Sequence, residues 1–190
     1  EIKHLIENCD ACQQFRASQP LEYMQTSSAS SPMESVSMDI FTLTQKDYLV
    51  IVDRYSGFPW VFKLRSLNTE DILKCFTQVI QMFGAPEKCR TDGGPQFRTS
   101  FTRFCDEWGI RHELSSPYNP RSNGHAEITG KSMKHLLSKH HSNWEQFEAS
   151  LLEWRNTPRQ GQVSPAELMF ARRQKTLLPG SGMSHPQRSR

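Results

Sequence analysis

This 190-residue sequence has few cysteines and no long apolar run. Its five cysteines are an odd number, and only Cys9 and Cys12 lie close together, so we expect no disulfide framework and a reducing, intracellular compartment. No stretch approaches the ~18 consecutive apolar residues of a membrane helix, so we expect a soluble protein. The chain starts at Glu1 without Met or a basic-then-apolar leader. We therefore expect no signal peptide here and a piece of a longer protein.

The chain also carries little net charge. Its formal net charge is +3 at pH 7, with histidine neutral. Residues 171–190 contain five basic residues and no acid, which leaves −2 for residues 1–170. Net charge alone therefore does not identify a nucleic-acid-binding core.

The apolar pattern begins with strands. Residues 36–40 alternate apolar and polar side chains, and apolar runs follow at residues 48–52 and 60–62. Turn formers separate these segments, at residues 45–47 and 56–57. The pattern predicts three strands in an antiparallel meander.

Helices dominate the rest of the chain. Apolar residues recur at helical spacing in four segments, 72–83, 101–108, 125–140 and 144–154. Two short strands are predicted between the first three of them, at residues 88–91 and 110–115. Ser164, followed by Pro165 and Glu167, predicts a last short helix. We therefore predict an α/β fold: a mixed sheet, with the meander first and then strands joined through helices, flanked by helices.

Composition divides the chain into four parts. Residues 13–35 contain turn formers without apolar periodicity, which indicates a linker. We expect a short N-terminal arm at residues 1–12, this linker at 13–35, the folded core at 36–170 and a basic flexible tail at 171–190.

Three acids fall where this layout brings elements together. Asp39 lies within the first strand, Asp92 follows a later strand, and Glu127 is in the first turn of the third helix. Strand ends and helix starts on one edge of a sheet form a natural cleft. Mg²⁺ prefers oxygen ligands, so three converging carboxylates could share two Mg²⁺ or Mn²⁺ ions for an in-line phosphoryl displacement. Spacing alone also permits the alternative that these are three ordinary acids among 20.

Six short strings carry a resemblance to a known family. They are SMDIF (37–41), YLVIVDRYS (48–56), TDGGPQF (91–97), SSPYNPRSNGHAE (115–127), WRNTP (154–158) and SPAEL (164–168). In this order they resemble the integrases of retroviruses and gypsy-type long-terminal-repeat retrotransposons, and the resemblance covers about residues 1–178. One such string is weak evidence, whereas six in the family's order are specific. The gap from Asp92 to Glu127 is one residue shorter than in many members, which is a loop-sized difference.

The resemblance implies an RNase H-like fold and an integrase-type polynucleotidyl transferase. Such a protein of a transposable element catalyses metal-dependent DNA strand transfer, and so DNA integration and recombination, and binds nucleic acid. The resemblance further implies that Asp39, Asp92 and Glu127 are its catalytic and metal-binding triad. The implied partners are DNA, as retroelement ends and target DNA, and further copies of the chain, with no membrane. The implied site of action is the nucleus, after synthesis in the cytoplasm.

Two alternatives remain open at this point. The first is a domesticated or decayed integrase-derived protein that binds DNA or a partner without catalysis. Gly130 fits that alternative, because glycine in a helix costs about 1 kcal/mol relative to alanine. The second is an RNase H-type hydrolase, which shares the fold and the metals; the loop string before Glu127 and the Cys-x-x-Cys pair favour an integrase.

Basic and polar groups near Glu127 are candidates for DNA contact. Lys131 and Lys134 share a helix face with Glu127, and their ammonium groups suit DNA phosphates. The alternative is a solvated face with an intrahelical Glu127–Lys131 pair. The loop before the helix, which in the family is mobile and touches DNA, contributes Tyr118, Asn119, Arg121 and Asn123, although such residues are often only turn formers.

The N-terminal residues resemble the end of the family's His-His-Cys-Cys zinc arm. A tetrahedral zinc site needs four ligands, and only Cys9 and Cys12 are present, since His4 aligns with a non-ligand position. We therefore predict an incomplete zinc half-site, with zinc bound only in a longer parent chain. Cys75 and Cys105 lie on apolar helix faces, and we expect both to be core thiols.

Overall fold

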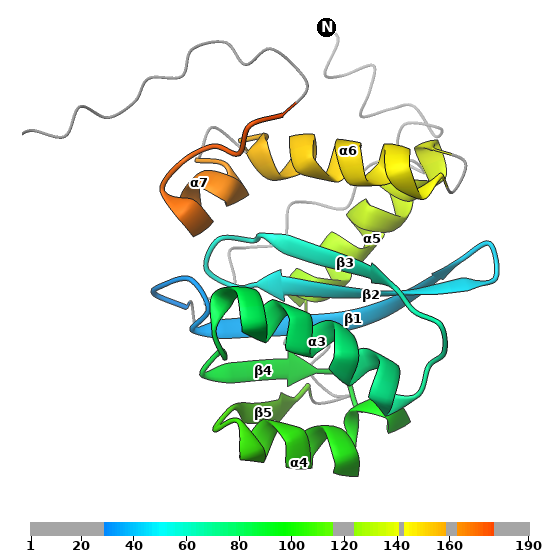
Figure 1. The fold of residues 1–190 in the computed structure, drawn as a ribbon, viewed down its shortest axis with the longest axis vertical. Coiled ribbons are helices and arrows are strands. Elements are labelled where there is room, and N and C mark those ends of the chain that lie inside the picture. Colours follow the sequence, from blue (N-terminus) through cyan, green and yellow to red (C-terminus); the bar gives the residue numbers. More distant parts are fainter. Residues whose placement is uncertain (1–28, 116–123, 141–142, 159–162, 177–190) are drawn as a thin grey trace, which may run out of the picture.

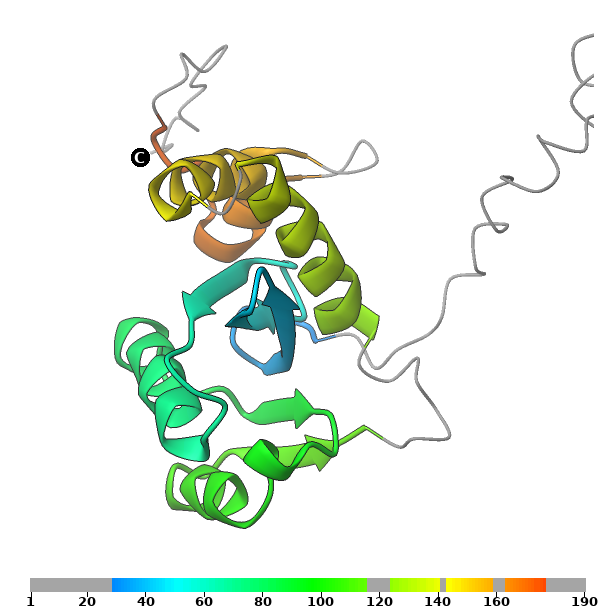
Figure 2. The same cartoon turned by 90° about the vertical axis from the view of Figure 1, so that its right-hand side faces the viewer.

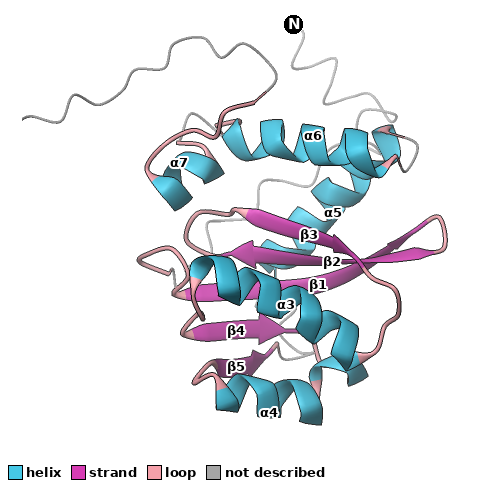
Figure 3. Ribbon diagram, in the orientation of Figure 1, coloured by secondary structure: helices cyan, strands magenta, loops and turns pink. Residues whose placement is uncertain are grey.

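The computed structural model describes residues 29–115, 124–140, 143–158 and 163–176, with residues 124–127 described by their backbone alone. A five-stranded mixed sheet lies at the centre of this part of the chain (Figures 1 and 3). Its strands are β1 (Ser35–Leu43), β2 (Lys46–Asp53), β3 (Pro59–Lys63), β4 (Lys88–Thr91) and β5 (Arg111–Leu114). Their spatial order is β3-β2-β1-β4-β5.

The pairing of the strands matches the predicted meander. β1 pairs antiparallel with β2, and β2 pairs antiparallel with β3. β1 also pairs parallel with β4, and β4 with β5, through connections that contain helices. The predicted α/β fold with a mixed sheet is therefore confirmed.

Helices cover both faces of the sheet. They are α3 (Thr69–Phe83), the single-turn 3₁₀ helix η1 (Pro95–Phe97), α4 (Thr99–Glu107), α5 (Gly124–Lys139), α6 (Trp144–Asn156) and α7 (Pro165–Phe170). Figure 2 shows α3 and α4 on one face and α5 on the other, while α6 and α7 lie beyond the β3 edge. No helix in the described part of the chain combines the length and the apolar character needed to cross a bilayer.

The central strand β1 contributes side chains to two separate cores. Val36 and Met38 pack in the core on the α3 side. Phe41 packs in the second core, which also contains Val50 of β2 and Met133 of α5. Because side chains alternate along a strand, odd-numbered β1 residues face α5 and even-numbered residues face α3. This alternation decides which polar residues of β1 lie beside α5.

Local chemistry explains where α3 begins and ends. The Asn68 side chain caps the helix by accepting a hydrogen bond from the Asp71 backbone N–H at 2.9 Å. The helix ends at Gly84, whose φ of 87° belongs to the left-handed region that glycine adopts without strain. α3 thus contains the segment 72–83 predicted from apolar spacing and begins three residues before it.

The hairpin between β1 and β2 departs from the prediction. The predicted turn at residues 45–47 is one residue too far along the chain. β2 already begins at Lys46, which pairs with Leu43, so Thr44 and Gln45 alone make the turn. Their φ values of 47° and 58° fit a two-residue type I′ turn, which usually carries Asn-Gly or Asp-Gly. A Thr-Gln pair gives no such signal in the sequence.

Candidate functional site

Asp39 and Asp92 come from neighbouring parallel strands. The pairing of β1 with β4 places Ser37 opposite Arg90. Continuing that register by two residues places Asp39 opposite Asp92, which directly follows β4. Both acids lie two residues beyond a paired position, so they fall on the same side of the sheet, with the strands roughly 4.8 Å apart.

Helix α5 covers this side of the sheet at Asp39. Phe41, two residues after Asp39, packs in the core that contains α5 residues, so Asp39 also faces α5. A methyl group at Gly130 of α5 would lie 3.4 Å from Asp39 Oδ2 and 3.6 Å from Val50 Cγ1. The helix backbone therefore passes close to the carboxylate, with room at residue 130 for a methyl group and little more.

Backbone groups orient both carboxylates. Asp39 is half-buried, and its Oδ1 accepts a hydrogen bond from the Ile40 N–H at 2.9 Å. Asp92 is exposed, and its Oδ1 accepts from the Gly94 N–H at 3.0 Å. The candidate site thus combines the half-buried carboxylate of Asp39 with the solvent-exposed carboxylate of Asp92.

Glu127 lies on α5, one turn before Gly130, but its side chain is outside the described residues. Among the residues with described side chains, no three His, Cys, Asp or Glu groups gather as a metal-binding cluster. The register and the helix contact relate Asp39, Asp92 and α5 to one another. The role of Asp39, Asp92 and Glu127 as a triad stays a prediction.

The other predicted contacts divide between exposed and undescribed positions. Lys131 and Lys134 are exposed on α5, whereas Met133 and Leu137 of the same helix are fully buried. The lysines are therefore available to a partner. The remaining predicted site residues lie outside the described part of the chain: Cys9, Cys12, Tyr118, Asn119, Arg121 and Asn123.

Two arginines beside the acids were missed by the sequence analysis. Arg54 is buried and donates from Nη1 to Ser37 Oγ at 3.1 Å. Arg90 of β4 forms an ion pair with Glu113 of β5, with Nε 3.2 Å from Oε2. Burial lowers the pKa of Arg54, Arg90 lowers it further, and Glu113 opposes both. The sequence could have indicated Arg90. It lies two residues before Asp92 and so shares its side of the sheet, as Ser37 does with Asp39.

Asp53, in the string YLVIVDRYS, has a structural role. Its side chain is fully buried. Oδ1 accepts from the Met33 N–H at 2.8 Å, while Oδ2 accepts from the Ser56 N–H at 2.7 Å and the Ser56 hydroxyl at 2.6 Å. This acid organises the turn after β2.

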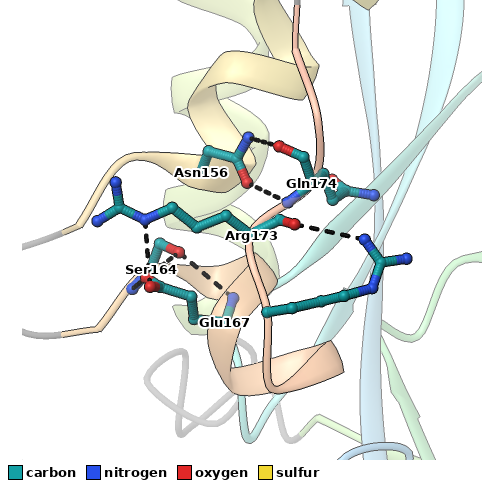
Figure 4. Close-up of polar contacts among 6 residues, drawn as sticks. Asn156, Ser164, Glu167, Arg173 and Gln174 are labelled. Atoms are coloured by element: carbon teal, nitrogen blue, oxygen red, sulfur yellow. Dashed lines mark hydrogen bonds and ion pairs between the residues drawn. The ribbon is translucent and has the colours of Figure 1, made fainter. Parts of the chain in front are cut away.

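The strings WRNTP and SPAEL also stabilise the fold, as Figure 4 shows. The Asn156 amide donates to Gln174 O at 2.7 Å and accepts from Gln174 N at 2.9 Å. Ser164 and Glu167 form a capping box at the start of α7, and Arg173 pairs with Glu167 at 3.1 Å. These contacts hold the segment after α7 against α6.

The described cysteines are all free thiols. Cys105 is buried, which confirms it as a core thiol, and burial raises its pKa to about 12. Cys75 is only half-buried and packs at the margin of the core on the α3 side. Cys89 was not singled out from the sequence; it is fully buried, with its Sγ 3.3 Å from Met38 Sδ.

The fold belongs to a known class. The catalytic core domain of bovine immunodeficiency virus (BIV) integrase superposes with a TM-score of 0.63 at 21% identity, covering 73% of this chain and 95% of that one. The human T-cell leukemia virus 2 (HTLV-2) integrase core, solved with magnesium in a dimeric form, gives 0.60 at 21% identity, over 73% and 97%. A chain of the simian T-cell lymphotropic virus intasome, solved in complex with the PP2A regulatory subunit B56 gamma, gives 0.68 at 23% identity, over 97% and 69%. The fold is therefore the RNase H-like fold of integrase catalytic cores.

Sequence comparison identifies the domain more closely. Residues 29–120 match the family model of the integrase core domain. The Gag-Pro-Pol polyprotein of bovine leukemia virus is 39% identical over 93 residues, covering 48% of this chain and 7% of the polyprotein. The uncharacterized protein K02A2.6 of Caenorhabditis elegans is 27% identical over 189 residues, covering 94% of this chain and 15% of that protein. This chain thus spans a small part of its curated relatives, and the resemblance to integrases is confirmed over residues 29–120, which are similar to the integrase core domain.

Proposed function

We propose that this chain is the catalytic core of an integrase-type polynucleotidyl transferase that carries out metal-dependent DNA strand transfer. The observation that carries the proposal is the β1–β4 register: it pairs Ser37 with Arg90 and, extended by two residues, would bring Asp39 beside Asp92 on the side of the sheet that α5 covers. Glu127, one helical turn before Gly130, is the third acid of the proposed site. Its position on α5 fits, because Gly130 lies against the Asp39 carboxylate.

The donor set suits a hard divalent cation. Asp39, Asp92 and Glu127 offer only carboxylate oxygens, the ligands that Mg²⁺ and Mn²⁺ accept. The exposure of Asp92 leaves room for water and for DNA phosphate oxygens beside the protein ligands. Bound Mg²⁺ or Mn²⁺ would supply Lewis acidity toward the scissile phosphate and the attacking hydroxyl.

Cationic groups of the chain would position the DNA. Lys131 and Lys134 are exposed on the helix that carries Glu127, so their ammonium groups can reach backbone phosphates. Tyr118, Asn119, Arg121 and Asn123 are proposed to add contacts from the preceding segment. Arg54 and Arg90 place positive charge on the side of the sheet that carries Asp39 and Asp92, which offsets repulsion between the carboxylates.

The second candidate is an integrase-derived protein that binds DNA or a partner without catalysis. Likeness to a protein of Caenorhabditis elegans over 94% of the chain is compatible with that option. Gly130, however, no longer supports decay of the site, since α5 lies so close to Asp39 at this position that a side chain larger than a methyl group would press the helix away. All three acids are present, so we favour the active enzyme over this candidate and over an RNase H-type hydrolase.

The wider proposals rest on the relatives. The HTLV-2 integrase core has been solved in dimeric and trimeric forms, which supports a homo-oligomer here. The intasome of the simian virus supports retroelement ends and target DNA as partners. The nucleus remains the proposed site of action. The division into a zinc-arm remnant at 1–12, a linker at 13–35, the catalytic core at 36–170 and a basic tail at 171–190 remains proposed, as does zinc binding in a longer parent chain.

Asp92→Asn tests the enzyme proposal. We expect the variant to lose strand transfer on labelled branched DNA in Mg²⁺ or Mn²⁺, because the amide cannot replace the carboxylate as a ligand. Cooperative unfolding should persist, since Asp92 is exposed and accepts only a local bond from Gly94. Asp106→Asn, at an exposed position on α4, is the matched control and should retain activity. Metal-dependent DNA binding without strand transfer in the unmodified chain would instead favour the non-catalytic candidate.

A further inference from the structure

His112 of β5 lies on the face of the sheet opposite the acids. It pairs with Cys89 of β4, and its ring packs edge-on against Phe101 of α4 with centroids 5.0 Å apart. Both ring nitrogens have partners: Nε2 lies 2.8 Å from Thr91 Oγ1, and Nδ1 lies 2.9 Å from Thr102 Oγ1. The imidazole thus joins Thr91 of β4, the residue before Asp92, to Thr102 of α4.

Counting protons gives the direction of each hydrogen bond. The Thr91 hydroxyl has one proton, and it donates that proton to the Asp92 main-chain carbonyl at 3.0 Å. With that proton assigned to the carbonyl, the contact with His112 runs the other way, from Nε2–H to Thr91 Oγ1. In the neutral ring Nδ1 is then the acceptor of the Thr102 hydroxyl proton. Burial lowers the pKa of His112, which favours this neutral ring near pH 7.

The chain of bonds ends at the peptide that follows Asp92. Gly93 and Gly94 come next, and two glycines have little intrinsic conformational preference. The Thr91 bond fixes the orientation of the Asp92 carbonyl, and the Gly94 N–H then holds Asp92 Oδ1 at 3.0 Å. Thr91 is fully buried, so we expect no water molecule to replace His112 as the partner of its hydroxyl group.

We infer that His112 is a positioning residue, which acts through Thr91 to set the orientation of the Asp92 carboxylate for divalent-metal binding. This inference rests on the proposed function, because it assigns Asp92 as a ligand. His112 itself packs against α4 on the other face of the sheet, so it acts through Thr91 and not as a ligand.

Two amide substitutions at residue 112 separate positioning from packing. In His112→Gln the amide nitrogen takes the place of ring Nε2 and can still donate to Thr91. In His112→Asn the shorter amide takes the place of Nδ1, so it can reach Thr102 but not Thr91. Both variants remove the ring from Phe101, and a purely structural role predicts similar losses from both.

The readout is Mn²⁺ binding to the whole chain, measured by titration calorimetry, together with the Mg²⁺ concentration for half-maximal strand transfer. We expect His112→Asn and Thr91→Val each to weaken Mn²⁺ binding roughly tenfold, as loss of an outer-shell partner does at other metal sites. His112→Gln should stay within about twofold of the unmodified chain. The double variant Thr91→Val/His112→Asn should lose no more than either single variant, because both break one chain of bonds.

Asp92→Asn separates the two ways of failing. Mn²⁺ binding that does not depend on Asp92 would overturn the proposed function and this inference with it. Binding that depends on Asp92 but weakens equally in His112→Asn and His112→Gln, or in neither, would overturn the positioning role alone.

Discussion

The structure changes the interpretation of Gly130. In the sequence it is a weak helix former inside a predicted helix, which fitted a decayed protein. In the structure its α-carbon faces Asp39 and Val50, and a methyl group there would lie 3.4 and 3.6 Å from their side chains. These are ordinary van der Waals separations, so there is room for one methyl group and little more.

At this scale we predict that Gly130→Ala raises the free energy of unfolding by up to about 1 kcal/mol, because alanine has the better helix propensity. Gly130→Val should instead lower it by about 1 to 3 kcal/mol, since the added methyl groups press α5 away from β1. Urea unfolding of both variants measures this. A less stable Gly130→Ala would mean that the approach of α5 to Asp39 tolerates no side chain.

At the scale of elements, Arg155 fastens helix α6 to the sheet. Its guanidinium donates from Nε and Nη2 to Pro59 O at 3.0 and 2.8 Å, and its Cζ lies 4.5 Å from the centroid of the Phe58 ring. Burial lowers the pKa of Arg155 to about 10, and Glu148 partly opposes this shift. The side chain stays cationic at neutral pH and remains bound to a strand carbonyl.

Arg155→Lys should therefore lower the free energy of unfolding by about 1 to 3 kcal/mol, although the charge is kept. An ammonium group has no planar fork to make both bonds to one carbonyl while it lies over an aromatic ring. Arg111→Lys, at an exposed position, is the control and should change little. Equal stability of the two lysine variants in urea would show that charge alone holds α6.

The capping box of α7 gives a prediction that depends on pH. Hydrogen bonds from Ser164 lower the pKa of Glu167 from 4.5, and Arg173 lowers it further. A carboxylate with a lowered folded pKa stabilises the fold above its unfolded pKa, and that contribution disappears as pH falls through the folded value.

We expect Ser164→Ala to cost about 1 kcal/mol at pH 7, through loss of the cap. The difference from the unmodified chain should shrink as the pH is lowered below 4.5, because Glu167 becomes protonated in both. Ser138→Ala is the control, since Ser138 is exposed and donates only to Lys134 O of its own helix. A difference that is constant from pH 7 to pH 3 would contradict the contribution of Glu167.

The secondary-structure elements also show how much of the fold could be predicted from the sequence. Within the described part of the chain, periodicity and capping residues predicted every strand and all helices except η1, because apolar spacing reports which faces are buried. The turn at Thr44 and Gln45 was misplaced, since its left-handed backbone is imposed by the hairpin rather than by those side chains. Strand order was not predicted, because local patterns do not report long-range pairing.

The candidate site could likewise be predicted only in part from the sequence. Asp39 and Asp92 could be proposed as site residues because each sits in a family string, Asp39 within a strand and Asp92 directly after one. Arg54, Arg90 and His112 were missed, since their roles arise from cross-strand and helix contacts such as those to Ser37, Glu113 and Thr102. A search for polar residues two positions from each acid would have found Arg90 but not His112, which belongs to the other face.

At the scale of the whole molecule, the uneven charge predicts how DNA affinity responds to salt. Residues 1–170 are net negative, and the last 20 residues carry five positive charges. Affinity for DNA should therefore be weak and should fall steeply as salt rises. The contacts of Gln174 with Asn156 show that truncation should follow residue 176, so that the α6 segment keeps its anchor.

Removing residues 177–190, with Arg188 and Arg190, should reduce the slope of log affinity against log salt by up to about 2, close to one unit for each lost phosphate contact. Fluorescence anisotropy with a labelled duplex at several salt concentrations measures it. Substituting Gln for both arginines in the full-length chain is the matched control and should give the same slope as the truncation. An unchanged slope would place the DNA-binding charge within the folded core.

The alternation of side chains along β1 limits where residues can be inserted into this chain. Inserting one residue between Ser35 and Asp39 would turn the Asp39 carboxylate toward α3 and bring the following apolar side chain to the α5 side. Inserting two would restore the side but shift the acid by roughly 6.6 Å along the strand. Segments outside the paired strands, such as residues 84–87 between α3 and β4, face no such restriction. Among relatives, the number of residues between the first two acids can therefore change freely in connections, while the odd or even count within β1 and β4 cannot.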